Sequence, residues 1–313
     1  MRRGPSERAV PRTEVDVTAG AATGLAAGFA SLPSWTLDEN QLADLEMLLS
    51  GVFAPLTGFM TAADVAAVYE SGTLADGFPW PVPVTLDVPE DAVPTAQRRL
   101  ALNDPEGVPL AVLDISERSP ALVPPMARAG RGGRHARPEG AAPPGGAAAS
   151  GLVRLSGQVI QCRDPEHGPF RQLRRAPAQV QAELGDGPVL AFITRRPLNA
   201  RQIGQLRHVA GQQRARLLLL PLVTGTADVV ATPEALVRAV RAATRHLPLG
   251  TLVVPLALAS RDVSPERELA LRALVAAAYG ATHLFTDEPE APSVPTAIPV
   301  MSDRKSTRLN SSH

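Results

Sequence analysis

The second half of the chain alternates short apolar runs with amphipathic helical patterns, and this order constrains the fold more than any other feature. The apolar runs have the length of buried strands, and they lie at Val189–Thr194, Leu217–Pro221, Thr251–Leu256 and Thr282–Thr286. A helix is expected from about Leu198 to Ala210, between the first two runs. Apolar strands separated by amphipathic helices indicate a parallel sheet that is covered by helices on both faces.

Two further helices carry clear start signals. Thr232 is the expected N-cap of one, with Pro233 at the first helical position and Glu234 at the positive end of the helix dipole. This helix places one apolar face toward the sheet, formed by Leu236, Val240, Ala243 and Leu247. The next helix opens with Ser264-Pro265-Glu266 and ends at Gly280, where a left-handed residue is common.

Length and composition limit the classes of partner. A chain of 313 residues with 44% hydrophobic residues is long enough for two domains with ample cores. The formal net charge is zero, so no general electrostatic attraction favours nucleic acid or an acidic membrane surface. No apolar run approaches the ~20 residues of a membrane-spanning helix. We therefore expect neither nucleic-acid nor membrane partners.

The single cysteine and the first 30 residues both bear on the compartment. Cys162 cannot form an internal disulfide, which suits a reducing cytoplasm, and with no neighbouring basic cluster it is expected to be a packed residue and not a nucleophile. Residues 1–30 carry Glu7, Glu14 and Asp16 and only a weak apolar stretch, so we expect a disordered leader instead of a secretory signal.

Two segments have the composition of chain outside the folded core. Residues 127–151 contain mostly Ala, Gly, Pro and Arg, which predicts a flexible insertion in the amino-terminal domain; its arginines fit a solvated loop better than a polyanion site. Residues 303–313, DRKSTRLNSSH, resemble a translated sequencing adaptor and hold Lys305, the only lysine of the chain. We treat this tail as an artefact and expect the natural protein to continue past Met301.

The most informative motif is ITRRPLNARQ, residues 193–202, at the end of the first expected strand. It resembles the Q-T-R-N-P-x-H-x-x-H signature of ATP sulfurylases (sulfate adenylyltransferases), with Thr194, Arg195 and Pro197 retained. The other four signature positions are changed, to Ile193, Arg196, Asn199 and Gln202.

The resemblance extends over most of the chain. Gln41–Met60 and Asp76–Val88 are similar to the family's amino-terminal domain, and Arg163–Gly168 to the segment that joins it to the catalytic domain. Arg267-Glu268 and Tyr279–His283 are similar to a later helix and strand, but Asp287–Pro292 replaces the glycine-rich "GRDHAG" loop. The resemblance implies a β-rich PUA-like domain over residues 31–165, followed by a doubly wound nucleotidyltransferase-like domain over 166–302 that is incomplete at its carboxyl end.

The residues of the motif suit an anion. Ligands of open parallel sheets bind beyond the carboxyl ends of the strands, where Thr194, Arg195 and Arg196 are expected just before a helix N-terminus. The resemblance assigns Arg195 to sulfate; the alternative is that both arginines only pair with acidic surface groups. Secondary candidates are Arg261, which lies out of register in the region of the family's "MRxAG" sulfate loop, and Arg267.

Two hypotheses on function follow. In the first, the chain is a sulfate adenylyltransferase-like protein whose catalysis is impaired, acting as a structural or regulatory partner, or as the front part of a fusion with adenylylsulfate kinase. In the second, it is an active nucleotidyltransferase in which Arg196 or Arg201 compensates for the missing histidines, on sulfate or another oxyanion.

Substrates and partners are implied by the same resemblance. They are an oxyanion and a nucleotide, with ATP and Mg²⁺ as the substrate form, and further copies of the chain or an adenylylsulfate kinase as protein partners. No covalently bound cofactor and no metal site are expected, since the histidines are scattered without ligand spacing. A Walker-A loop is absent, so the kinase itself is not within this chain.

Overall fold

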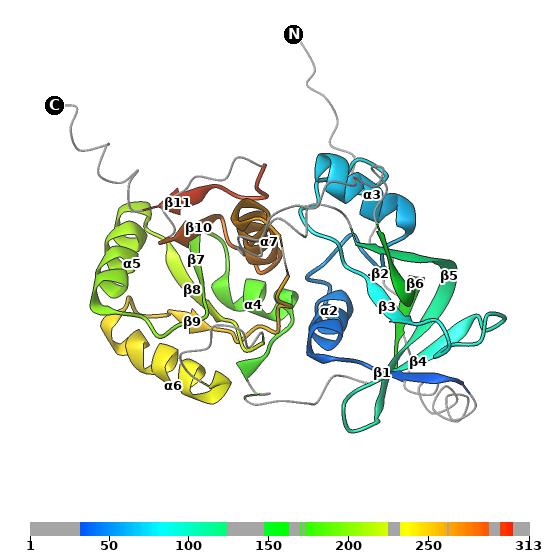
Figure 1. The fold of residues 1–313 in the computed structure, drawn as a ribbon. Helices are drawn as coiled ribbons and strands as arrows, with labels where there is room; N and C mark the ends of the chain where they lie inside the picture. The colour runs from blue at the N-terminus through cyan, green and yellow to red at the C-terminus, as the bar shows by residue number, and fades with distance from the viewer. Residues whose placement is uncertain are drawn as a thin grey trace, which may run out of the picture.

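The protein contains two β-sheets in separate layers, with helix α2 (Glu39–Leu49) lying between them (Figure 1). The computed structural model describes residues 32–123, 147–162, 170, 173–224, 232–261, 263–287 and 295–302. The expected leader, the joining segment 163–168 and the tail 303–313 lie outside these residues. No helix within the described ranges is long and apolar enough to span a membrane.

The amino-terminal domain is built on a six-stranded sheet of order β1-β4-β5-β6-β2, with β3 also paired to β6. All pairs are antiparallel except β1 with β4. Helix α3 (Ala62–Ser71) follows β2. The strands are β1 (Ser34–Thr36), β2 (Gly58–Phe59), β3 (Leu86–Pro89), β4 (Arg99–Asn103), β5 (Pro109–Val123) and β6 (Ala147–Gln161).

The core of this domain forms around two aromatic rings. Phe53 and Trp80 are fully buried and meet edge to face, with 5.5 Å between ring centroids. Strands β2 and β6 cross closely at Gly58, where a Cβ atom would lie 1.9 Å from the carbonyl oxygen of Gly157. The structure also changes one expectation: the last five residues of the predicted insertion, 147–151, belong to β6, because the β5–β6 ladder continues to Val123 and Ala147.

The second domain has a five-stranded parallel sheet of order β11-β10-β7-β8-β9, which confirms the predicted sheet type. Its strands are β7 (Val189–Thr194), β8 (Arg216–Pro221), β9 (Leu252–Val253), β10 (His283–Thr286) and β11 (Val300–Ser302). Its helices are α4 (Pro177–Leu184), α5 (Ala200–Gln213), α6 (Pro233–Ala243) and α7 (Pro265–Ala278), with a short 3₁₀ turn η3 (Thr244–His246) after α6.

Helices cover both faces of the parallel sheet, as the sequence predicted. Alternate residues of β7 point to opposite faces: Phe192 packs with α5 and α6, whereas Ala191 and Ile193 belong to the larger core that includes α4 and α7. That larger core continues into the amino-terminal domain without a break. The α7 face of the sheet is therefore the face that meets the other domain (Figure 1).

The predicted helix caps are present. Thr232 accepts a hydrogen bond from the N–H of Ala235 at 3.3 Å, and Ser264 accepts one from Arg267 at 3.4 Å. Gly280 has a φ of 88°, which is the left-handed conformation expected after α7.

Other boundaries differ from the prediction. Strand β9 holds only two residues where six were expected, because Pro255 has no N–H for a ladder; Leu256 keeps a single bridge to Leu222. Helix α5 starts at Ala200 and runs to Gln213, two residues later and three residues further than predicted. Helix α4 and strand β11 were not predicted.

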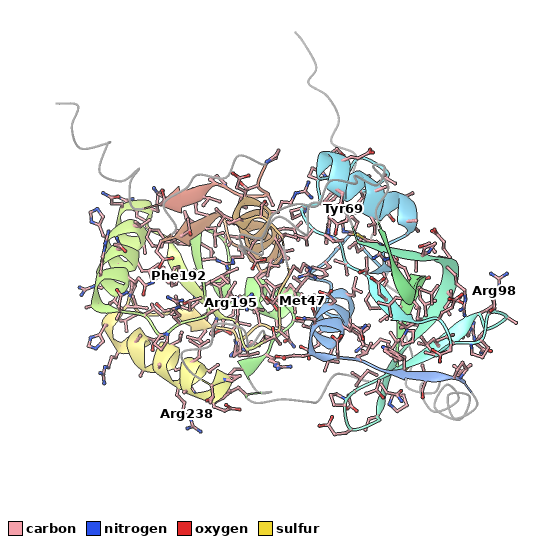
Figure 2. All side chains as sticks on the ribbon, in the orientation of Figure 1. Met47, Tyr69, Arg98, Phe192, Arg195 and Arg238 are labelled. Atoms are coloured by element: carbon pink, nitrogen blue, oxygen red, sulfur yellow. The ribbon has the colours of Figure 1, made fainter. Side chains whose placement is uncertain are left out.

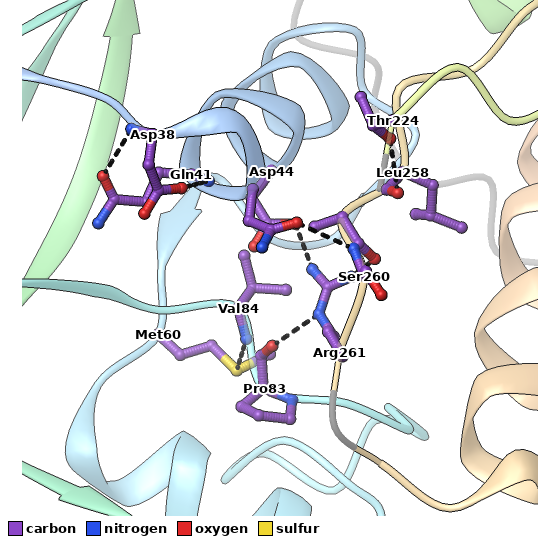
Figure 3. A network of polar contacts seen from close by, with 12 residues as sticks. Asp38, Gln41, Asp44, Met60, Pro83, Val84, Thr224, Leu258, Ser260 and Arg261 are labelled. Atoms are coloured by element: carbon purple, nitrogen blue, oxygen red, sulfur yellow. Dashed lines mark hydrogen bonds and ion pairs between the residues drawn. The ribbon is translucent and has the colours of Figure 1, made fainter. Parts of the chain in front are cut away.

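The domains meet around a buried ion pair between Arg261 and Asp44 (Figure 3). Both side chains are only 9% exposed. The Arg261 guanidinium also donates to the carbonyls of Pro83 at 3.2 Å and Ala259 at 3.1 Å, and it lies 5.9 Å from the centre of the Phe53 ring. Burial raises the pKa of Asp44, and the Arg261 charge partly offsets this effect.

Two more arginines fasten the same boundary. Arg267 of α7 donates to the carbonyls of Val68, Tyr69 and Pro81 in the amino-terminal domain, at 2.7, 3.1 and 3.2 Å. Arg174 contacts both carboxylate oxygens of Glu46 at 3.1 Å. The two domains are thus held together by charged and polar contacts as well as by a shared apolar core.

We predict that Asp44→Ala lowers the free energy of unfolding by ~3–5 kcal/mol, because it leaves the Arg261 charge buried without its counter-ion. Urea denaturation measures the change. The matched control is Asp114→Ala, which breaks the exposed pair of Arg99 and Asp114, 3.9 Å apart, and should cost less than ~1 kcal/mol. Equal losses in the two variants would contradict the proposed importance of the buried pair.

We also predict that Cys162, at the end of β6, reacts slowly with alkylating reagents. Burial raises the pKa of its thiol from 9.0 to about 11, so at pH 8 the reactive thiolate is roughly 100-fold scarcer than in the unfolded chain. Iodoacetamide labelling followed by mass spectrometry, with and without urea, gives the two rates on the same single cysteine. A native rate close to the unfolded rate would show an activated thiol.

Candidate functional site

The candidate site lies at the carboxyl edge of the parallel sheet, where β7 ends at Thr194. Thr194 is 8% exposed, and its hydroxyl accepts a hydrogen bond from the N–H of Arg196 at 3.0 Å and donates to the carbonyl of Arg196 at 2.7 Å. This local pair of bonds fixes the turn that leaves the strand. Thr194 therefore shapes the loop that presents the two arginines.

Arg195 is held across the edge of the sheet. Its guanidinium donates to the carbonyl of Thr224, which follows β8, at 2.9 Å, and lies 3.6 Å from the carboxylate of Glu268 on α7. Thr224 in turn donates from its hydroxyl to the carbonyl of Leu258, beyond β9, at 2.7 Å. Figure 2 shows Arg195 in the interior, on the side of the sheet toward Met47, whereas Arg238 points outward from α6.

Glu268 links Arg195 to a second arginine. Its Oε1 atom lies 3.4 Å from Nε of Arg272, one turn further along α7. Its Oε2 atom is buried and has no hydrogen-bond partner within the described part of the chain. Arg195 therefore has an acidic partner, as the alternative role of pairing with an acidic group requires. The side chain of Arg195 is still 27% exposed.

Arg196 differs from Arg195. It is exposed, and no ion pair of its side chain occurs among the described residues. At this edge it is a guanidinium that is accessible to a ligand.

Asn199 and Gln202 organise the start of α5. Asn199 is the N-cap and accepts from the N–H of Gln202 at 2.9 Å, and the side chain of Gln202 accepts from the N–H of Asn199 at 2.9 Å. The amide of Gln202 also donates to Asp287 at 2.7 Å. Asn199 precedes the helix as its cap and Gln202 lies in the first turn, so the two side chains bond to each other's backbone at the start of α5.

Three other predicted positions contribute no side chain to this edge. Ile193 is 6% exposed and packs in the core on the α7 face of the sheet. Arg261 and Arg267 contact the amino-terminal domain through Asp44 and through backbone carbonyls, as described above. The contacts of both arginines position the domains against each other.

Two acidic residues of the site were not singled out from the sequence. Glu268 carried a signal, since it stands beside Arg267 in a motif, but its role depends on the approach of α7 to Thr224 and Arg195. Asp287 is the first residue in place of the expected glycine-rich loop. Together they balance much of the positive charge at the edge.

No group of three or more His, Cys, Asp or Glu side chains suited to a metal ion occurs in the described ranges. The cationic groups at the edge are the guanidinium groups of Arg195 and Arg196, next to the N-terminus of α5. Such a set favours oxyanions, because guanidinium groups donate forked hydrogen bonds to oxygen.

Two family models match the chain. A PUA-like domain model covers residues 13–121, and an ATP-sulfurylase model covers residues 171–292. The first match begins inside the stretch that composition predicts as a leader.

Curated relatives give the same assignment. The chain is 34% identical to a sulfate adenylyltransferase of Deinococcus radiodurans over 265 residues, covering 83% of this chain and 66% of the relative. It is 36% identical to that of Deinococcus deserti, covering 81% and 65%, and 27% identical to that of Eremothecium gossypii, covering 81% and 51%. The chain thus spans between half and two thirds of the length of these relatives.

One solved structure is similar to most of this chain. The hexameric APS kinase from Thiobacillus denitrificans matches with a TM-score of 0.72 and 30% identity, over 90% of this chain and 53% of that chain. The two family matches and the curated relatives point to one family. The chain belongs to the ATP sulfurylase family, with a PUA-like domain ahead of the parallel-sheet domain.

Proposed function

We propose that this chain is a sulfate adenylyltransferase-like domain that binds an oxyanion at Arg195 but transfers adenylyl groups poorly or not at all. The single observation that carries the impairment is the contact of Gln202 with Asp287, 2.7 Å apart at the start of α5. The Asp287 carboxylate therefore lies beside the helix N-terminus. This is the position where the helix dipole and the free N–H groups would stabilise the polyphosphate of a nucleotide most strongly.

Adenylyl transfer needs positive charge on the departing pyrophosphate. The protein has to orient sulfate against the α-phosphorus and to neutralise charge as the leaving group separates. Asn199 and Gln202 supply neutral amides, and both are already committed to the capping box. The acidic Asp287 opposes the same charge.

Oxyanion binding is retained in this proposal. Arg195 is preorganised by the Thr224 carbonyl, and Arg196 is exposed on the same turn. Glu268 competes with a ligand for Arg195, so we expect weak binding. ATP with Mg²⁺ would be the nucleotide form in any residual reaction.

The biological role follows from the family and from the length of the match. We propose that the chain acts in sulfate activation as a structural or regulatory partner, either joined to or assembled with an adenylylsulfate kinase. The neighbour from Thiobacillus denitrificans, a hexameric APS kinase about half covered by this chain, supports this arrangement. We also propose the boundary between the two domains near residue 165.

An active nucleotidyltransferase is the second candidate. It is favoured by Arg196, which replaces an asparagine of the family signature and is exposed at the edge. Arg196 and Arg201 would then supply the charge that histidines supply in the family. The planar guanidinium and its longer reach make this substitution geometrically different.

We predict that sulfate and pyrophosphate raise the thermal stability through Arg195. At ten times Kd the expected stabilisation is ~1.4 kcal/mol, measured as a shift in Tm. Arg195→Ala should abolish the shift, while Arg238→Ala, an exposed arginine on α6, should leave it unchanged. Glu268→Gln should increase the affinity, because it removes the competing carboxylate. An unchanged Tm shift in Arg195→Ala would show that the anion does not bind at this edge.

We further predict no adenylylsulfate formation above a blank reaction from ATP and sulfate. Loss of one preorganised charge-stabilising donor costs ~3 kcal/mol, or roughly a hundredfold in rate, and two are missing here. Restoring Ile193→Gln, Arg196→Asn, Asn199→His and Gln202→His together should not be sufficient, since Asp287 still stands at the helix N-terminus. Sulfate-dependent pyrophosphate release by the unmodified chain that is lost in Arg195→Ala would establish the second candidate.

A further inference from the structure

A large cavity lies at the boundary of the two domains and shares none of the residues of the oxyanion edge. Its volume is about 960 Å³. It is enclosed by the end of α3, the Phe78–Pro81 segment, α4, α7 and residues 295–297. Figure 1 shows α7 on the side of the parallel-sheet domain that faces α3. Cavities of this size at domain boundaries are typical binding sites for small organic molecules.

The walls are mainly apolar. Phe78, which is 42% exposed, Trp80 and Leu274 supply the largest apolar side chains, and Ala270 and Ala277 leave space along α7. Gln181 of α4 donates to the carbonyl of Ala278 at 2.7 Å and joins two of the walls. An apolar ring or chain would bury itself here with a favourable hydrophobic contribution.

One wall carries a charge without a counter-ion. Arg267 is half-buried, and its three hydrogen bonds go to the carbonyls of Val68, Tyr69 and Pro81. No carboxylate among the described residues lies within ion-pair distance of it. Glu70 also borders the cavity but is exposed, so solvent screens its charge. The wall at Arg267 is therefore electropositive.

Trp80 lies behind the same wall. The side chain is fully buried, and its indole N–H has no acceptor among the described residues. Because the indole nitrogen is closed off from the cavity, Trp80 forms part of the apolar backing of the wall, and the charge of Arg267 carries the recognition of an anion.

We propose that this cavity binds an organic anion with an apolar body, such as an aromatic or long-chain carboxylate or sulfonate. The apolar part fills the space between Phe78 and α7, and the anionic group lies toward Arg267. Because Arg267 and the Phe78–Pro81 segment belong to different domains, the ligand would contact both domains at once. This proposal is independent of adenylyl transfer and of the Arg195 edge.

The test compares two fluorescent probes that differ in charge. 8-Anilinonaphthalene-1-sulfonate has an aromatic body with a sulfonate, and N-phenyl-1-naphthylamine has the same body without it. On the folded full chain, we expect one saturable site for the anionic probe and roughly tenfold weaker binding of the neutral probe. Equal affinity for the two probes, or binding without saturation, would overturn the proposal.

Variants place the probe in this cavity. Ala277→Trp fills the space along α7 and should weaken binding of the anionic probe at least ~10-fold, whereas Ala235→Trp, on the exposed face of α6, should leave it unchanged. Unaltered binding in Ala277→Trp would overturn the proposal. If Ala277→Trp fails to fold, Leu274→Phe takes its place and should also weaken binding of the anionic probe. The comparison of the two probes on the unmodified chain tests the proposal without any variant.

A last control separates this site from the oxyanion edge. Arg195→Ala and an excess of sulfate should leave the binding of the anionic probe unchanged. Displacement of the probe by sulfate, or its loss in Arg195→Ala, would place the probe at the edge and overturn the cavity proposal. Failure of the cavity test with an intact sulfate shift would leave the proposed function standing.

Discussion

The contact on which the arrangement of this protein depends is the buried ion pair between Arg261 and Asp44. A charge away from water is tolerated only with a partner in good geometry, so this pair permits few relative positions of the two domains. Around it, Ala43, Ala257 and Ala259 allow α2 to approach the loop that follows β9, and Asn40 accepts from the N–H of Ser260 at 3.0 Å. The loop beyond β9 is therefore fixed by the amino-terminal domain, and through Leu258 and Thr224 this order reaches Arg195.

The carboxyl edge of the sheet satisfies much of its own polar chemistry. The first turn of α5 is capped by Asn199 and Gln202, Asp287 contacts Gln202, and Glu268 lies between Arg195 and Arg272. At an edge that binds a highly charged nucleotide, we would expect the arginines and the helix N-terminus to have fewer partners within the protein and to contact the ligand instead. Internal satisfaction stabilises the apo form and reduces the free energy that a phosphate group gains on binding. This balance is the physical basis for proposing oxyanion binding without efficient adenylylation.

Much of the fold could be predicted because its signals are local. The strands β7 and β8 are continuous apolar runs, and the starts of α6 and α7 carry a threonine or serine cap followed by proline, so each segment reports its own structure. The failures also have local reasons. Strand β11 has only three residues, directly after Pro299, and is ordered by pairing with β10, and β9 is cut short by Pro255. Helix α4 is only eight residues long and has an alanine at its N-cap position, so it offers no start signal other than Pro177.

The features of the candidate site can also be separated into those with a local sequence signal and those that depend on the tertiary structure. The sequence by itself determined the parallel sheet, the place of Thr194 to Arg196 at its carboxyl edge, and the loss of the family's charged motif positions, because these depend on residue type and on distance along the chain. Only the tertiary structure decided the partners of the charges. Glu268 lies 73 residues from Arg195 in the sequence, and Asp44 lies 217 residues from Arg261, yet each pair meets in space. Arg261 and Arg267 are arginines in family-like motifs, and their roles as contacts between domains follow from desolvation and packing, which no local pattern records.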